Sequence, residues 1–210
     1  MKITWIGHSC FKIEKNGYSI VTDPYSDGSV PGLAPVRVTA NQVLISHEHG
    51  DHNARNLVEI IPAEEAPFEI TELPTYHDHA KGTKRGSNTI HVIDDGEIRV
   101  AHFGDLGCEP EPEQLEMLKD LDVAIIPVGG FFTIDAKEAA ELVKKLQPKL
   151  VIPMHFRDDR KGFGFDVIGP VSLFSELAEA LTEADGSMLD TEKLPEAKVV
   201  VLTPRNLESR

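Results

Sequence analysis

One six-residue segment of the sequence, HEHGDH, carries four side chains that can bind a metal ion and follows a short apolar run. An extended chain sends residues two positions apart to the same side, so His47 and His49 can point at one ion. Gly50 permits a sharp turn that can bring Asp51 and His52 towards a second ion. Imidazole and carboxylate are ligands of zinc, iron and manganese. The segment therefore predicts a metal site, and a site for two ions needs further ligands from elsewhere in the chain.

Three other candidate ligands each follow an apolar strand and begin a loop, where a packed scaffold can aim them at one point. They are His77, Asp105 and His155. His79 lies in the same stretch as His77 and is an alternative to it. His102 is expected to point away from the site if its strand is regular.

Length and composition are those of an ordinary globular protein. A chain of 210 residues favours one domain over residues 1–210. Hydrophobic residues make up 40% and charged residues 27%, and no segment approaches the ~18 apolar residues of a membrane helix. The N-terminus lacks the pattern of a signal peptide. We therefore expect a cytoplasmic location and no membrane partner.

The negative net charge disfavours nucleic acid as a partner. The sequence has 21 Lys and Arg against 35 Asp and Glu, a net charge of −14, which would repel nucleic acid. Basic residues nevertheless follow two of the candidate ligands: Lys84 and Arg85 come after His77, and Arg157 comes after His155. These residues form either an ordinary solvated surface or a rim that attracts a small anionic substrate.

Strand patterns dominate the first half of the chain, and strands alternate with helices in the second half. Asn16-Gly17 predicts a hairpin, and Asn53 predicts the cap of a helix over 54–61. An apolar stripe through Leu173, Leu177, Ala180 and Leu181 predicts a helix face in the core. The strands are expected at 11–14, 18–22, 43–46, 68–75, 89–93, 98–102, 123–127, 150–153 and 199–202, and the other helices at 112–119, 135–146 and 172–183. This order predicts two packed sheets with helices outside.

Six motifs occur in the order GHSCF at 7–11, TDP at 22–24, SHEHGDH at 46–52, YHD at 76–78, GDLG at 104–107 and PMHF at 153–156. As a series they resemble the metallo-β-lactamase superfamily, and within it the branch of the bacterial L-ascorbate-6-phosphate lactonase and its uncharacterised relatives. The resemblance implies an α+β fold, an αββα sandwich of two mixed sheets covered by helices, with the site at the edge where the sheets meet.

The resemblance also implies roles for individual residues and two divalent ions, with zinc expected first and manganese or iron as alternatives. Asp23 would lie behind the ligands and fix one imidazole by accepting its proton. Asp51 and His8 are the candidate catalytic residues, with His8 expected to protonate the leaving group and His79 in reserve. One ion would be held by His47, His49 and His77, the other by Asp51, His52 and His155, and Asp105 would bridge them.

Two such ions would convert water into a hydroxide nucleophile. We therefore expect a metal-dependent hydrolase that acts on a small, anionic ester, lactone or phosphoester, with a sugar-phosphate lactone suggested by analogy. Two alternatives stay open: a phosphodiesterase or nuclease of the same fold, and an iron-dependent redox protein with the same ligands. The sequence does not indicate an oligomeric state.

Overall fold

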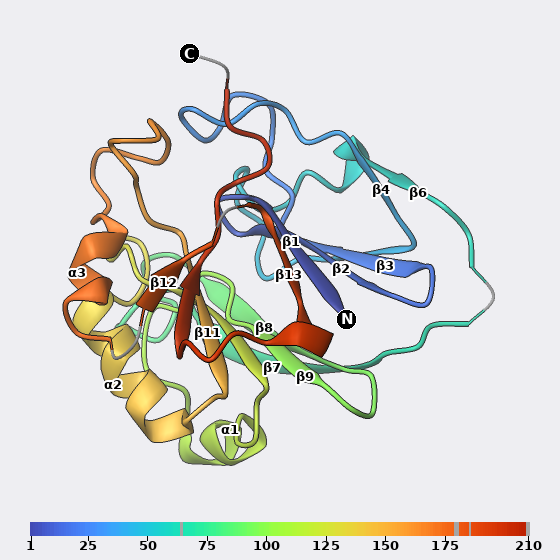
Figure 1. Cartoon of the computed structure of the whole chain (residues 1–210). Helices are drawn as coiled ribbons and strands as arrows, with labels where there is room; N and C mark the ends of the chain where they lie inside the picture. The colour runs from blue at the N-terminus through green and yellow to red at the C-terminus, as the bar shows by residue number, and fades with distance from the viewer. Residues whose placement is uncertain (64, 179–180, 185, 209–210) are drawn as a thin grey trace.

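Two β-sheets face each other in the computed structural model, which describes residues 1–63, 65–178, 181–184 and 186–208 (Figure 1). The first sheet has five strands in the order β13-β1-β2-β3-β5. Its strands are β1 (Lys2–Gly7), β2 (Cys10–Lys15), β3 (Tyr18–Thr22), β5 (Gln42–Leu44) and β13 (Met188–Asp190). Strand β13, from the last quarter of the chain, pairs with the N-terminal strand β1 in this sheet.

The second sheet has seven strands in the order β12-β14-β11-β10-β9-β8-β7. Strands β7 to β9 are antiparallel, and β9, β10, β11, β14 and β12 are parallel. The strands are β7 (Glu69–Tyr76), β8 (Ser87–Asp94), β9 (Arg99–His102), β10 (Val123–Pro127), β11 (Leu150–Met154), β12 (Leu181–Glu183) and β14 (Val199–Val201).

Three α-helices lie in the connections between the parallel strands, on the outer side of the second sheet (Figure 1). They are α1 (Pro112–Met117), α2 (Ala136–Leu146) and α3 (Val171–Ser175). A small parallel pair, β4 (Val38–Ala40) and β6 (Val58–Ile60), and two 3₁₀ turns, η1 (Arg55–Leu57) and η2 (Thr191–Lys193), complete the described elements. The predicted α+β sandwich of two mixed sheets is confirmed.

Local sequence explains several of these elements. Asn16 and Gly17 both have positive φ, 52° and 82°, as the predicted tight hairpin between β2 and β3 requires. Asp135 caps α2 by accepting bonds from the backbone N–H groups of Lys137 and Glu138, both at 2.9 Å. Strand β10 is buried along its whole length, which explains its unbroken apolar sequence.

An aromatic cluster in the core joins the two halves of the sandwich close to two candidate site residues. The Trp5 ring lies 5.4 Å from the ring of Phe156 and 5.7 Å from that of Phe163. Trp5 is fully buried, and its indole N–H donates to the carbonyl of His8 at 2.9 Å. Core packing thus fixes both the turn at His8 and the turn at His155, the residue before Phe156.

The predicted helix over 54–61 is wrong. Residues 55–57 form the 3₁₀ turn η1, and the chain then extends as β6, which pairs with β4. The side chain of Asn53 donates to Glu48 at 3.2 Å and caps nothing. Val58 and Ile60 are β-branched, and their pairing with β4 stabilises the extended chain over the helix.

The predicted helix over 172–183 is also wrong in its second half. Helix α3 ends at Ser175, and residues 181–183 form β12, which pairs with β14. Leu173 and Leu177 are 48% and 45% exposed and therefore do not form the expected core stripe, while Ala180 lies outside the described residues. Within the described part of the chain, no helix is both long and apolar enough to cross a membrane.

Candidate metal centre

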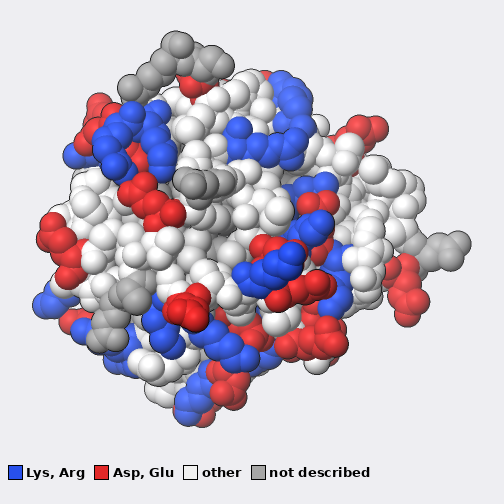
Figure 2. Space-filling view, in the orientation of Figure 1, with Lys and Arg blue, Asp and Glu red and all other residues white. Residues whose placement is uncertain are grey.

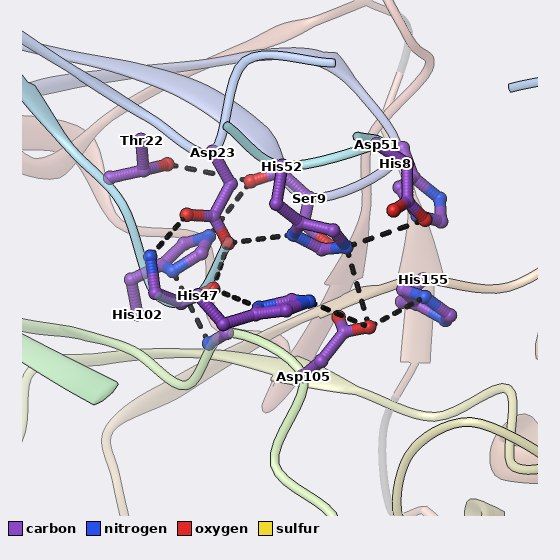
Figure 3. A network of polar contacts seen from close by, with 12 residues as sticks. His8, Ser9, Thr22, Asp23, His47, Asp51, His52, His102, Asp105 and His155 are labelled. Atoms are coloured by element: carbon purple, nitrogen blue, oxygen red, sulfur yellow. Dashed lines mark hydrogen bonds and ion pairs between the residues drawn. The ribbon is translucent and has the colours of Figure 1, made fainter. Parts of the chain in front are cut away.

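The candidate ligands lie where several strands end, and Figure 3 shows five of them, His47, Asp51, His52, Asp105 and His155, close together. Strands β7, β9 and β11 run in the same direction, so the loops after them leave from one edge of the second sheet. The HEHGDH segment follows β5 of the first sheet. Four of the site residues directly follow the last residue of a strand: His8, Asp23, His77 and His155.

Asp105 lies at the centre of this arrangement and is 2% exposed. Its Oδ2 is 3.2 Å from His155 Nε2 and 3.3 Å from His52 Nε2. The same oxygen is 3.4 Å from His77 Nε2 and 4.0 Å from His47 Nε2. Four imidazole nitrogens therefore surround one carboxylate oxygen, which is the position expected of a residue that bridges two ions.

Two groups of side chains flank Asp105, and each group could hold one ion. Within each group, one ligand atom from every member lies within 4.8 Å of the others. The first group is His47, His49 and His77; the second is His8, Asp51, His52 and His155. The structure therefore brings together all seven predicted ligands and adds His8 to the second group.

Buried polar atoms in this cluster lack hydrogen-bond partners. They include the Nε2 atoms of His47, His52 and His155 and the Oδ1 atom of Asp105. Leaving such atoms buried and unpaired costs about 1–3 kcal/mol each. Divalent cations would satisfy imidazole nitrogen and carboxylate oxygen together, so the donor set fits the metal ions that the sequence predicts.

Electrostatics prepares three of these groups for cations, whereas the carboxylates of Asp105 and Asp23 outweigh burial and raise the pKa of His52 well above its usual value, so that a cation there would displace a proton. Burial, with the neighbouring His155, lowers the pKa of His8 to about 4, and burial together with His52 lowers the pKa of His47 to about 3. Burial alone would raise the pKa of Asp105, but His155 and His52 hold it well below its usual range. His8 and His47 are thus neutral and Asp105 is ionised at pH 7, which are the states that bind a cation.

Asp23 lies behind the cluster, in the position that the family resemblance implies. Its Oδ2 lies 2.9 Å from His52 Nδ1 and accepts a bond from Ser46 Oγ at 2.5 Å, while its Oδ1 accepts from Ser46 N at 2.7 Å. Ser46 Oγ is also 2.9 Å from His47 Nδ1. Asp23 and Ser46 thus hold the Nδ1 side of two imidazoles and leave Nε2 of each facing the centre (Figure 3).

Asn88 positions Asp105 and was missed by the sequence analysis. Its Oδ1 accepts the backbone N–H of Asp105 at 2.8 Å, and its amide donates to Thr75 Oγ1 and to the Phe103 carbonyl. Asn88 is fully buried near the start of β8. One asparagine in a strand carries no signal by itself; its role follows only from the pairing of β8 with β9, the strand that leads to Asp105.

Gly104 has no room for a side chain, which yields a first prediction. It has a φ of 56°, and a Cβ there would lie 2.4 Å from both Asn88 Oδ1 and Ser46 Cβ. Gly104→Ala should destabilise the fold by about 2–4 kcal/mol and displace Asp105, with loss of bound metal. Chemical denaturation and metal analysis measure both effects. Gly96→Ala is the control, because Gly96 has a φ of 84° but open space around it; equal effects in the two variants would contradict the close packing at Gly104.

Three site residues have strained backbones. His8, Asp23 and His155 have φ values of 52°, 40° and 53°, in a backbone region that residues other than glycine rarely adopt. Such strain persists only where the surrounding structure enforces it, and it is common at functional sites. Here the Trp5 bond to the His8 carbonyl is one such constraint.

A cavity of about 440 Å³ opens over the cluster. This is the size of a pocket for a small molecule. Its walls are Ser29, His49, Gly50, Asp51, His77, Arg85, Asp105, Phe132 and Phe165. His8 is 2% exposed and is not part of these walls; its Nε2 lies 3.4 Å from Asp51 Oδ2 and its ring lies 4.2 Å from that of His155.

Two further histidines, His79 and His102, belong to neither group. The side chain of His79 is 64% exposed and lies 3.6 Å from Glu138, so His77 and not His79 joins the first group. His102 is buried, and its Nε2 bonds to the carbonyl of Ser9 at 2.8 Å. This packed position agrees with its expected orientation away from the site.

Of the three basic residues predicted to form a rim, only Arg85 lines the cavity. Lys84 is exposed. Arg157 lines a separate cavity, donates to the Asp166 carbonyl at 2.5 Å and lies 3.2 Å from Asp159. The sequence could not separate them, because which way each loop turns depends on its own hydrogen bonds.

Comparison with known proteins identifies the family. The Beta-lactamase superfamily domain family matches residues 2–155. A UPF0173 metal-dependent hydrolase of Pyrobaculum calidifontis is 31% identical over 74% of this chain and 84% of its own. Another from Hyperthermus butylicus is 28% identical over 98% of this chain and 97% of its own.

Solved structures agree. A Thermotoga maritima protein assigned as a Zn-dependent hydrolase of the metallo-beta-lactamase superfamily is 35% identical, with a TM-score of 0.75 over 96% of this chain and 97% of its own. A metallo hydrolase of Ignicoccus hospitalis, 23% identical over 97% of this chain and 95% of its own, shares the fold with a TM-score of 0.64. The chain therefore belongs to the beta-lactamase superfamily domain family, and it is a metal-dependent hydrolase with the metallo-β-lactamase fold.

Proposed function

We propose that this chain hydrolyses a small ester, lactone or phosphoester at a site for two divalent ions. The observation that carries the proposal is Asp105 Oδ2, which four imidazole nitrogens surround at 3.2–4.0 Å between two groups of candidate ligands. His47, His49 and His77 would hold one ion, and Asp51, His52 and His155 the other, with Asp105 shared. Zinc is our first expectation, because imidazole and carboxylate are its common ligands in catalytic sites.

When bound, such ions supply Lewis acidity, which lowers the pKa of a coordinated water and polarises a carbonyl or phosphoryl oxygen. The chain's own residues orient the metal-binding imidazoles and shape the cavity in which the substrate would bind. Asp23 and Ser46 fix two imidazoles, while Phe132 and Phe165 line the cavity with apolar surface. Asp51 is 25% exposed at its side chain and lines the cavity, so its carboxylate can accept a proton from an attacking water.

Surface charge supports a small-molecule substrate. Lys and Arg are interspersed with Asp and Glu over the face drawn in Figure 2, with no continuous basic surface there. The net charge of −14 repels a polyanion, whereas a cavity of about 440 Å³ suits a compact molecule.

His8 lies within the second group and off the cavity wall, so we propose that it contacts the ion and does not protonate the substrate as the sequence suggested. His8→Ala should lower the affinity for the second ion about 10- to 100-fold, the range typical of a lost group beside a metal. Competition with a metal-binding dye measures this affinity. His102→Gln is the control, since His102 is equally buried and bonds to Ser9. Two full-affinity ions in His8→Ala would contradict the assignment and favour the proton-donor role.

A substrate panel tests the reaction. Protein purified without chelator and loaded with zinc or manganese should hydrolyse 4-nitrophenyl esters, simple lactones or 4-nitrophenyl phosphate, and lose this activity in dipicolinate. Preference for bis(4-nitrophenyl) phosphate would favour the phosphodiesterase alternative. No hydrolysis of any of these compounds by protein with two bound ions would contradict the proposal.

A further inference from the structure

The Arg85 guanidinium stands at the cavity over two aromatic rings. Its Cζ lies 5.4 Å from the ring centroid of Phe132 and 5.8 Å from that of Phe131. Among the described residues, no ion pair or side-chain hydrogen bond to Arg85 occurs. In a chain with 35 acidic residues against 21 basic ones, a half-buried arginine that faces only aromatic rings keeps its donors free for a ligand.

The loop that carries Arg85 is held by one buried carboxylate. Asp78 Oδ1 accepts the backbone N–H groups of Ala80 and Gly82 at 2.7 and 3.1 Å, and its Oδ2 accepts those of Lys84 and Arg85 at 3.0 and 2.7 Å. Asp78 is 3% exposed and directly follows the candidate ligand His77. The backbone at Arg85 is therefore fixed relative to the metal cluster before any ligand binds, which lowers the entropy cost of binding.

The aromatic side of the cavity is tied to the cluster as well. The Phe132 and Phe165 rings are 6.1 Å apart, and Phe132 lies 6.4 Å from the His155 ring. The loop before Phe132 approaches so closely that a Cβ on Gly129 would lie 2.1 Å from the His155 carbonyl oxygen. Phe132 and Phe165 thus form an apolar wall of the cavity between the candidate metal ligands and Arg85.

We propose that Arg85 selects substrates that carry an anionic group separate from the bond that is hydrolysed. The scissile carbonyl or phosphoryl group would lie at the metal cluster, an apolar segment would pack on Phe132 and Phe165, and a carboxylate or phosphate would pair with Arg85. This inference rests on the proposed function and names its substrate class: small anionic acyl or phosphoryl esters with a short apolar segment.

Two esters with the same leaving group and a four-carbon acyl chain test the inference. Mono-4-nitrophenyl succinate carries a carboxylate, and 4-nitrophenyl butyrate does not. The ratio of their kcat/KM values should favour succinate in the wild type and fall about ten- to a hundredfold in Arg85→Met, the range of one charge-assisted hydrogen bond. The ratio for Arg85→Lys should lie between those of the wild type and Arg85→Met, because lysine keeps the charge but loses the planar guanidinium.

Lys84→Met is the matched control, because it removes the same charge one residue away on an exposed side chain. It should leave the ratio unchanged. General damage to the site would lower both kcat/KM values and leave their ratio intact, so the ratio reports selectivity and not folding. An unchanged ratio in Arg85→Met, or an equal fall in Lys84→Met, would overturn the inference.

Calorimetric titration with benzoate separates this inference from the proposed function. Metal-loaded wild type and Lys84→Met should bind benzoate with equal affinity, and Arg85→Met about tenfold more weakly at equal metal content. If benzoate binds through Arg85 but neither ester is hydrolysed, anion recognition stands and the hydrolysis of such esters fails. If the esters are hydrolysed but replacement of Arg85 changes neither benzoate binding nor the ratio, the proposed hydrolysis stands and the inference about Arg85 fails. Absence of both benzoate binding and an Arg85 effect would sink the inference.

Discussion

Asp105→Asn should abolish binding of both ions at ordinary concentrations and lower kcat by at least about a thousandfold, or roughly 4 kcal/mol of barrier. The cause is geometric, because one oxygen of Asp105 faces nitrogens contributed by both groups of candidate ligands. The amide has nearly the same shape but no charge, so it cannot balance two cations. Metal analysis after gel filtration, with kinetics on the same sample, measures the effect.

Asp122→Asn is the control for loss of a buried carboxylate. Asp122 is 5% exposed, precedes β10, accepts the backbone N–H of Arg99 at 2.8 Å and pairs with Lys149. This variant should keep both ions and full turnover, because Asp122 contacts none of the candidate ligands among its described partners. Two retained ions in Asp105→Asn would contradict the bridging position.

Removal of metal should lower the melting temperature on the order of 10 °C. A ligand that binds only the folded state at a thousandfold excess over its Kd stabilises it by about 4 kcal/mol, and about 2–4 °C per kcal/mol is typical of this chain length. Without cations, the Nε2 atoms of His47, His52 and His155 and the Oδ1 atom of Asp105 have no hydrogen-bond partner among the described residues. Scanning calorimetry with zinc and with dipicolinate measures the difference.

The Asp105→Asn protein provides the internal check, because its melting temperature should be the same with and without the chelator. Manganese should restore the wild-type value after the chelator is removed. A wild-type melting temperature that is insensitive to chelation, in a sample shown to lose bound metal, would mean that the cluster gains no stability from cations.

Sequence reasoning succeeded where a local pattern determines the structure. Asn16-Gly17 forms the predicted hairpin, and Asp135 caps a helix within one residue of the expected start. The resemblance to the family implied that Asp23 lies behind a liganding imidazole, and the structure places its Oδ2 2.9 Å from His52 Nδ1. The candidate ligands were likewise grouped by the resemblance, and the expectation that loops after strands can aim them at one point is general.

Contacts between residues far apart in the chain could not be predicted from the sequence. The bond between Asn88 and Asp105 needs the pairing of β8 with β9, and the contact of Arg85 with the rings of Phe131 and Phe132 joins two loops far apart in the chain. The failed helix over 54–61 has a similar cause. Its residues fit a helical pattern, but the tertiary pairing of β6 with β4 decides the outcome.

The most direct test is a crystal structure of the zinc-loaded protein with anomalous data collected on both sides of the zinc absorption edge. Two peaks should flank Asp105: one among His47, His49 and His77, and the other among His8, Asp51, His52 and His155. No peak at this cluster, or a single peak with the imidazoles of the second group bonded to other partners, would contradict the two-ion site.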